Sequence, residues 1–315
     1  MEGFFREHLS LFPDAAEFIS LRINQHDPLY VLDQNASLAE YKIVVRQNDG
    51  TEKKHFLRGS SDVGQKRQKH FHILQALRQT GFDTGINIVA KPLGYFPQFH
   101  LLLYFNVPGE SLYDKFQYAA KEVWKEATKK ATDWLVDFHE KKPLNIPEAA
   151  FEPGEERNKF MALVEEVSKN FPDHEQAVRK AVAQIMRDEE GLFEPSKFHL
   201  IHGDFQPHNL IFRDLPQQTI AIDFNDAMYY DELYDITYFI TQTWVMLHSL
   251  HGMRSTDFLA PLLDYYLERR GIVRDEVVER KIQLFRIKTL IHIKSVTQYQ
   301  IIQDIEKYLE TFSKN

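Results

Sequence analysis

The apolar pattern of this chain changes near residue 108, from short strand-like runs before it to long helical stripes after it. Runs at Tyr41–Val45 and His55–Arg58 flank Asn48–Gly50, whose residues tolerate positive φ and therefore favour a hairpin turn. A helical segment follows, with apolar residues at three-residue spacing and Gly81 in position to end it. The other strand-like runs are Leu29–Leu32, Asn87–Ala90 and His100–Phe105. These patterns predict a small, mostly antiparallel sheet with one helix.

The later residues carry mostly helical patterns. An apolar stripe runs from Trp124 to Phe138 at helical spacing, and Asp173 with Gln176 has the pattern of a capping box at the next helix. Further helices are predicted over residues 232–250, 256–270 and 274–312. At 315 residues the chain is longer than one ordinary core needs. We therefore expect an α+β protein with a small sheet domain over residues 1–107 and a larger, mostly helical domain over residues 108–315.

A strand-like interruption of the helical region holds the densest polar chemistry in the chain. It contains His202-Gly-Asp-Phe-Gln-Pro-His-Asn209, an apolar run, the turn Asp214–Gln218, a second apolar run and then Asp223. If the two apolar runs pair as a hairpin, Asn209 begins one strand and Asp223 follows the other, so their side chains approach each other at one end. Asp204 lies on the loop that leads into Asn209.

This set of side chains suits phosphoryl transfer. A carboxylate and an amide oxygen that converge on one point are ligands that Mg²⁺ prefers. A second carboxylate nearby can take the proton from an attacking hydroxyl while metal ions neutralise the phosphates. The spacing Asp-x-x-x-x-Asn, followed by a hydrophobic-Asp-Phe element, is that of the catalytic loop and metal-binding aspartate of protein kinases.

The wider sequence resembles a known family. The strings Leu200–Phe212, Ile222–Ala227 and Leu233–Ile236 resemble the aminoglycoside phosphotransferase and choline kinase-like superfamily of small-molecule kinases. Asn106–Leu112 and Trp134–His139 resemble the segment after its interlobe hinge and its helix ending in Leu-His. The resemblance implies a bilobal protein kinase-like fold, with a nucleotide-binding sheet lobe and a helical lobe that carries the catalytic loop and the acceptor site.

The resemblance also assigns roles to individual residues. It implies that Asp204 is the catalytic base, that Asn209 and Asp223 are Mg²⁺ ligands, and that Arg58, Tyr104 and Asn106 bind the nucleotide. His202 would pack under the catalytic loop, and Asp235 would brace that loop from the following helix.

Two positions depart from the family pattern. Arg58 stands where the family has the lysine that contacts the nucleotide phosphates, and His70 stands where a helix normally supplies that lysine's glutamate partner. Arginine can bind phosphate through a bidentate fork, but it is bulkier than an ammonium group, and a histidine cannot neutralise it. A pseudokinase that binds nucleotide or a small ligand is therefore a second hypothesis. A third is a metal-dependent hydrolase, in which His202 and His208 hold Zn²⁺ or Mn²⁺.

The function implied by the resemblance is transfer of the γ-phosphate of ATP or GTP to a hydroxyl of a small molecule, with Mg²⁺ as cofactor. The acceptor would be an aminoglycoside, an amino alcohol or a sugar-like compound, and no motif selects among them. The acidic, aromatic segment 226–234 could hold a cationic acceptor, or it could be an ordinary acidic helix start.

Composition limits the partners and the compartment. The net charge of −8 disfavours nucleic acid and anionic membranes as partners. There is no cysteine, no apolar run of bilayer-spanning length and no signal-peptide pattern at the amino terminus. We therefore expect a soluble cytoplasmic protein.

Overall fold

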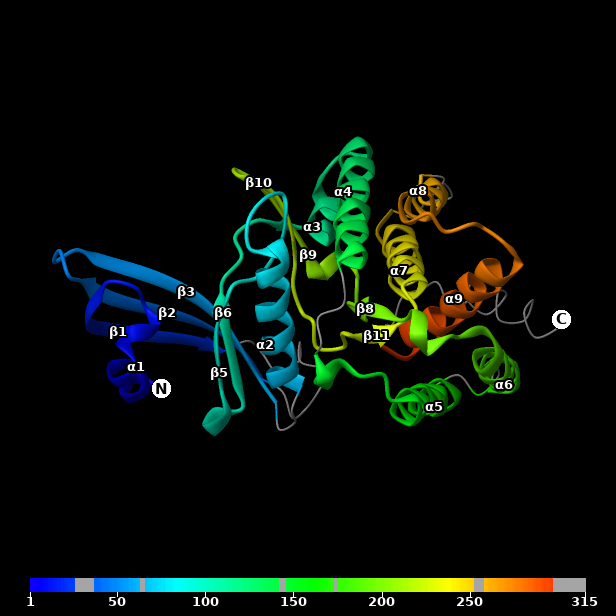
Figure 1. The fold of residues 1–315 in the computed structure, drawn as a ribbon, viewed down its shortest axis with the longest axis horizontal. Helices are drawn as coiled ribbons and strands as arrows, with labels where there is room; N and C mark the ends of the chain where they lie inside the picture. Colours follow the sequence, from blue (N-terminus) through cyan, green and yellow to red (C-terminus); the bar gives the residue numbers. More distant parts are fainter. Residues whose placement is uncertain are drawn as a thin grey trace. The chain divides into compact units, whose positions relative to one another are not determined.

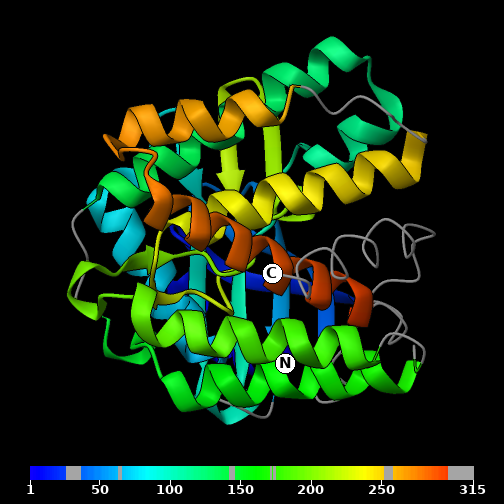
Figure 2. The same ribbon diagram turned by 90° about the vertical axis from the view of Figure 1, so that its right-hand side faces the viewer.

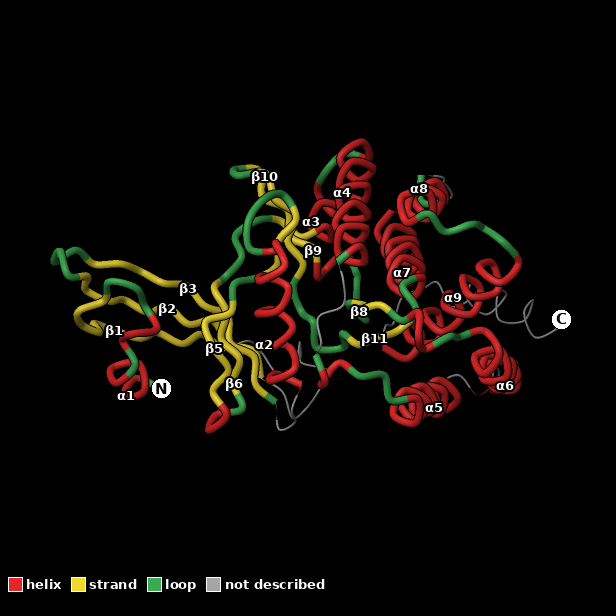
Figure 3. The backbone as a smooth tube through the Cα atoms, viewed as in Figure 1, coloured by secondary structure: helices red, strands yellow, loops and turns green. Residues whose placement is uncertain are grey.

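A computed structural model describes residues 1–25, 37–62, 66–141, 146–170, 172, 175–251 and 258–296. The chain divides into two compact units. The sheet unit consists of Met1–Gly109 with Ile220–Asn225, and the helical unit consists of Glu110–Thr219 with Asp226–Asn315. Strands dominate the sheet unit and helices dominate the helical unit (Figure 3), so the predicted α+β class is confirmed.

The sheet unit is built on one antiparallel sheet. Its five strands lie in the order β1 (Ala15–Gln25), β2 (Ser37–Gln47), β3 (Glu52–Ser61), β6 (Leu101–Phe105) and β5 (Pro92–Phe96) (Figure 1). The predicted hairpin joins β2 to β3, with Gly50 at a φ of 85° and the Gln47 amide donating to the Thr51 carbonyl at 2.8 Å. Strands β1 and β5 were not among the predicted strands, and Leu29–Leu32 lies outside the described residues.

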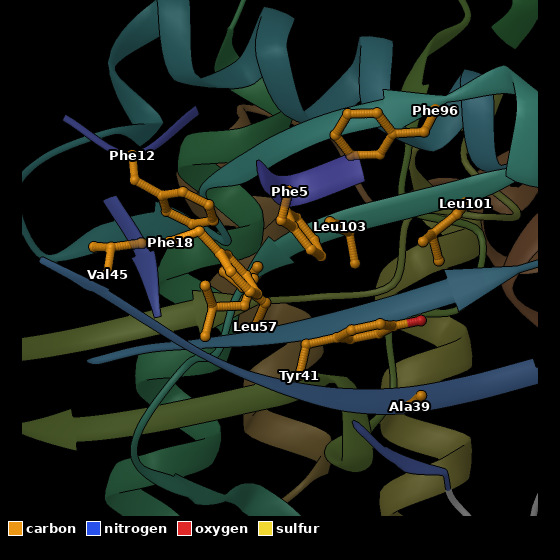
Figure 4. Close-up of a cluster of buried hydrophobic side chains, with 11 residues drawn as sticks. Phe5, Phe12, Phe18, Ala39, Tyr41, Val45, Leu57, Phe96, Leu101 and Leu103 are labelled. Atoms are coloured by element: carbon orange, nitrogen blue, oxygen red, sulfur yellow. The ribbon is translucent and has the colours of Figure 1, made fainter. Parts of the chain in front are cut away.

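A core of apolar side chains covers one part of this sheet. Phe5 from helix α1 (Glu2–Glu7) and Phe12 are fully buried among side chains of β1, β2, β3, β5 and β6 (Figure 4). The predicted helix is α2 (Lys66–Leu77), which contacts β5 and β6. It passes into a single wider turn that ends near Gly81, where φ is 100°. The unit also contains a short strand, β4 (Asn87–Val89).

The helical unit consists mainly of seven α-helices among its described residues. They are α3 (Leu112–Tyr118), α4 (Lys121–Glu140), α5 (Pro153–Asn170), α6 (Glu175–Leu192), α7 (Leu233–His251), α8 (Ala260–Arg270) and α9 (Glu276–Val296). Helix α7 packs against α8 and α9, and α5 packs against α6 and α9 (Figure 2). The predicted helices are therefore present, although Asp173, residues 256–257 and residues 297–312 lie outside the described part.

Short strands interrupt the helices where the sequence predicts them. Strand β8 (His199–Ile201) pairs with β11 (Met228–Tyr230), which the sequence analysis did not predict. Strand β9 (Leu210–Asp214) lies between β10 (Gln217–Ala221) and the two-residue strand β7 (Glu110–Ser111). The polar residues 202–206 thus connect the end of β8 to a 3₁₀ turn and β9.

Over the part of the chain that the structure describes, no helix combines the length and the apolar character that crossing a bilayer requires.

Candidate functional site

The loop after β8 owes its conformation to a glycine and a proline. Gly203 has a φ of 79°, and a Cβ atom at this position would lie 2.2 Å from the backbone oxygen of Asp226. Both the positive φ and the close approach therefore require glycine. Pro207 begins the 3₁₀ turn that ends at Asn209. The fixed φ of proline is compatible with this first helical position.

Asp235 braces this loop from the first turn of α7. Its carboxylate is fully buried and accepts hydrogen bonds from the backbone N–H groups of His202 (2.7 Å) and Gly203 (3.0 Å). His139 of α4 contacts the same carboxylate through Nε2 at 3.2 Å, and its Nδ1 lies 2.7 Å from the hydroxyl of Tyr266. A buried carboxylate needs several such partners. The bracing role that the resemblance implied for Asp235 is therefore matched by its contacts.

The carboxylate of Asp204 is held by three side chains. Tyr238 of α7 donates to Oδ1 at 2.9 Å, and Asn209 donates through Nδ2 to Oδ2 at 2.8 Å. Gln206 donates through Nε2 to both oxygens, at 2.9 Å each. Burial, with the nearby Asp204 carboxylate as a further cause, raises the pKa of Tyr238 well above its ordinary value. Its hydroxyl therefore stays protonated and donates.

Asn209 is oriented by two bonds from the same nitrogen. Besides the bond to Oδ2, Nδ2 donates to the backbone oxygen of Asp204 at 2.9 Å. The amide oxygen of Asn209 receives no hydrogen bond from the described residues. An amide oxygen of this kind is a suitable ligand for a hard cation such as Mg²⁺. The donor set at Asn209 thus fits a metal ligand.

In the sheet unit, His70 holds the segment that contains Asp223. His70 lies on α2 and is only 3% exposed. Its Nε2 accepts a hydrogen bond from the backbone N–H of Phe224 at 3.3 Å, so Nδ1 carries the proton and donates to Asn225 Oδ1 at 3.2 Å. Asn225 in turn donates through Nδ2 to Asp223 Oδ1.

Asp223 itself has a φ of 65°, in the left-handed region that few non-glycine residues adopt. In the sequence, His70 stands out only because it replaces the glutamate of the family pattern. The structure gives it a role of its own, because it fixes the two residues that follow Asp223.

Arg58 and Tyr104 are paired across neighbouring strands. They are register partners in β3 and β6, and Arg58 forms a hydrogen bond with the Tyr104 hydroxyl. Burial raises the pKa of Tyr104 to about 12, and the charge of Asp223 adds to this, while Arg58 and Arg67 oppose it. Positive and negative side chains therefore act on one buried hydroxyl.

The remaining predicted nucleotide residue, Asn106, is exposed just after β6. Its backbone N–H donates to the carbonyl oxygen of Phe56 at 2.8 Å.

The acidic residues after β11 serve the fold itself. Asp231 accepts from the Leu233 amide at the start of α7 and pairs with Lys281 at 2.7 Å. Glu232 accepts from Arg270 at 2.7 Å and from Tyr266 at 2.8 Å. Of the two interpretations of this segment, the contacts favour the acidic helix start.

The two histidines of the loop do not form a metal cluster. His202 is fully buried with its ring against Phe205, and His208 stacks on Tyr113 with the ring centroids 4.1 Å apart. Across the residues that the structure describes, no group of three or more His, Asp or Glu side chains is arranged to hold a metal ion. The hydrolase hypothesis therefore gains no support from the geometry.

Comparisons with known proteins identify a family match. The APH model, described as the phosphotransferase enzyme family, matches residues 54–277, which is well over half of the chain. A comparison with curated proteins finds no matching sequence.

Solved structures resemble the whole chain at low sequence identity. An amicoumacin kinase in complex with AMP-PNP, Ca²⁺ and Ami has a TM-score of 0.61 at 14% identity, covering 99% of this chain and 93% of that chain. ADP-bound aminoglycoside phosphotransferase APH(2'')-Ib has a TM-score of 0.57 at 14% identity, covering 100% and 99%. An ethanolamine kinase of Plasmodium vivax has a TM-score of 0.56 at 14% identity, covering 94% and 83%. These likenesses confirm the predicted protein kinase-like fold.

Proposed function

This chain belongs to the phosphotransferase enzyme family, and from that premise we propose that it moves the γ-phosphate of ATP or GTP to a hydroxyl group of a small molecule. The observation that carries the proposal is the held carboxylate of Asp204, which Tyr238 and Asn209 orient from two sides. The loop that bears it is anchored by the buried Asp235. A base for phosphoryl transfer needs this kind of fixed orientation.

Asp204 is the proposed catalytic base. The hydroxyl oxygen of the acceptor forms a bond to the γ-phosphorus, and the hydroxyl proton passes to the Asp204 carboxylate. The bond between the γ-phosphorus and the bridging oxygen breaks, and the nucleoside diphosphate leaves with that oxygen's electron pair. The products are a phosphate ester and ADP or GDP. Tyr238 and Asn209 keep the carboxylate aimed at the hydroxyl throughout this step.

Asn209 and Asp223 are the proposed ligands of Mg²⁺. The two residues would hold Mg²⁺, which would supply positive charge to neutralise the phosphates. The amide nitrogen of Asn209 is turned to Asp204, which leaves its oxygen for a cation. In the sheet unit, Asn225 and His70 orient the carboxylate of Asp223.

Arg58, Tyr104 and Asn106 are the proposed nucleotide-binding residues. The guanidinium of Arg58 is bonded to a tyrosine hydroxyl that stays protonated at neutral pH. A neutral partner does not cancel the positive charge of Arg58, so this charge can act on a phosphate group. This contact supports nucleotide binding without the usual lysine and glutamate pair.

The pseudokinase remains the second candidate, and the observation that favours it is the use of both ring nitrogens of His70 by residues 224–225. Two measurements separate the hypotheses. Melting curves with ATP or GTP, each with and without Mg²⁺, test nucleotide binding. Coupled detection of ADP or GDP release with a panel of aminoglycosides, amino alcohols and sugars tests turnover.

The variant Asp204→Asn tests the role of Asp204 as the base in the same two measurements. We expect it to keep the Mg²⁺-dependent melting shift and to lose turnover by about 10²- to 10⁴-fold, as removal of a general base does. Nucleotide binding without turnover for any acceptor would favour the pseudokinase. Full turnover by Asp204→Asn would remove Asp204 from the mechanism.

A further inference from the structure

The carboxylate of Asp204 has no vacant place for an incoming hydroxyl. A carboxylate has two oxygens with about two lone-pair positions each. Tyr238 and Gln206 donate to Oδ1, while Asn209 and Gln206 donate to Oδ2. Each oxygen thus already receives two hydrogen bonds from the described residues. An acceptor hydroxyl must donate to this carboxylate before it can be deprotonated, so one of the present donors has to leave.

The three donors differ in their burial and in the other contacts that hold them in place. Tyr238 lies in the core and is only 2% exposed. Its hydroxyl also accepts a hydrogen bond from Gln242 at 3.0 Å, and its ring stacks on Tyr234. Asn209 is 8% exposed and has a second bond to the backbone of Asp204. Departure of either side chain would break further contacts.

Gln206 has fewer contacts that hold it in place. It is only partly buried, and the hydrogen bonds of its side chain within the described structure are the two to Asp204. Gln206 lies between Gly203 and Pro207, directly before the 3₁₀ turn, and its side chain is long and flexible. Its departure would cost two bonds to the carboxylate, and an incoming hydroxyl would replace one of them.

We infer that Gln206 is a gate on the catalytic base: its amide occupies the place of the acceptor hydroxyl and is displaced when the acceptor binds. The inference rests on the proposed function. An amide nitrogen is a poor nucleophile. While Gln206 is in place, the group hydrogen-bonded at this position of the Asp204 carboxylate therefore cannot attack the phosphate. Gln206 thereby discriminates between the true acceptor and water.

The reaction that the gate suppresses is hydrolysis of the nucleotide. A water oxygen would bond to the γ-phosphorus, its proton would pass to Asp204, and the bond to the bridging oxygen would break. The products would be ADP or GDP and inorganic phosphate. Water is small and abundant, and without Gln206 it can take the vacant lone-pair positions.

The test measures phosphate release from ATP and from GTP with Mg²⁺ and without any acceptor. Gln206→Ala removes the amide, and Gln206→Met keeps the length of the side chain but has no donor. We expect both variants to release phosphate about tenfold faster than the parent, the factor that corresponds to one hydrogen bond to a charged group.

Two controls separate the gate from other effects. Tyr238→Phe also frees a lone-pair position on the carboxylate, but Tyr238 is only 2% exposed and the phenylalanine ring keeps that position closed to water. Its phosphate release should therefore not exceed that of the parent. In the double variant Gln206→Ala with Asp204→Asn, the gain should disappear, because the base that the gate covers is gone. Melting curves check that each variant is folded.

The outcomes distinguish this inference from the proposed function. If the parent shows Mg²⁺-dependent nucleotide binding but Gln206→Ala and Gln206→Met release phosphate at its rate, the gate is refuted and the proposed function stands. If only Gln206→Ala releases phosphate faster, the bulk of the side chain and not its hydrogen bonds excludes water, and the gate as proposed is refuted. If the parent binds neither nucleotide, the proposed function fails and the gate fails with it.

Discussion

Replacing Asp235 by asparagine tests the bracing of the catalytic loop with almost no change of shape. Oδ2 of the carboxylate accepts two hydrogen bonds, from His202 N–H and from His139 Nε2, whereas Oδ1 accepts one, from Gly203 N–H. The asparagine oxygen is therefore best placed at the Oδ2 position. Its NH₂ group then faces the N–H of Gly203, and two donors oppose each other in a buried site.

The expected cost follows from these three bonds. A hydrogen bond to a charged group contributes about 1.5–3 kcal/mol, and an unsatisfied buried donor costs a similar amount. We expect Asp235→Asn to lower the free energy of unfolding by about 3 kcal/mol. For a unit of this size that loss lowers the melting temperature by about 6–12 °C. Since Gly203 adjoins Asp204, a shift of about 1 Å there should also lower turnover by about 10²-fold.

Denaturant unfolding and the coupled turnover assay measure the two effects. Asp264→Asn is the matched control, because Asp264 forms an exposed pair with Arg274 and such pairs contribute little to stability. It should change the free energy of unfolding by less than about 1 kcal/mol and leave turnover unchanged. If Asp235→Asn is as stable and as active as the parent, Asp235 does not brace the loop and the reasoning is wrong.

Three further changes test other contacts. Gly203→Ala introduces a Cβ 2.2 Å from a backbone oxygen, so we expect a loss of at least about 2 kcal/mol in unfolding free energy; an unchanged denaturation midpoint would contradict this. His70→Leu removes both bonds to residues 224–225 and should weaken Mg²⁺-dependent nucleotide affinity about tenfold in titration calorimetry, while His70→Gln keeps more of it; equal affinities would refute the positioning role. Arg58→Ala should weaken binding of the triphosphate more than that of the nucleoside, since only the phosphates carry charge; equal losses would show that Arg58 does not reach them.

Local patterns predicted the elements that are bounded by characteristic turn residues. The hairpin of β2 and β3 follows from Asn48–Gly50, and the end of the wider turn that continues α2 follows from Gly81, because both turns need residues that tolerate positive φ. Strand β5 escaped prediction because Pro92 and Gly94 are unfavourable strand residues. Strand β11 has three residues and gains its partner β8 only through the fold.

Spacing placed Asp204 on the loop that leads into Asn209, and in the structure the two side chains meet through local geometry. Their contact spans the same short loop and its 3₁₀ turn, so it depends little on the rest of the molecule. Gln206 stood within the predicted motif, yet its bonds to Asp204 depend on a side-chain conformation that spacing cannot specify.

Contacts between distant residues could not be predicted in the same way. Tyr238 lies in the helix that the sequence predicted over residues 232–250. Its ring is buried, but its hydroxyl reaches Asp204. His70 contacts Phe224 and Asn225, far along the chain, through two ring nitrogens whose roles depend on the tautomer. A sequence pattern indicates which residues lie on one face of a helix, but it does not indicate which polar atoms their side chains will contact.

The central claim is that this protein forms a phosphate ester with Asp204 as the base. The most direct measurement is ³¹P NMR of ATP or GTP with Mg²⁺ and the acceptor panel, comparing the parent with Asp204→Asn. The account predicts a new phosphate monoester signal that accompanies ADP or GDP in the parent and falls by at least about 10²-fold in the variant. A monoester formed equally by both proteins, or none formed with any acceptor despite nucleotide binding, would contradict it.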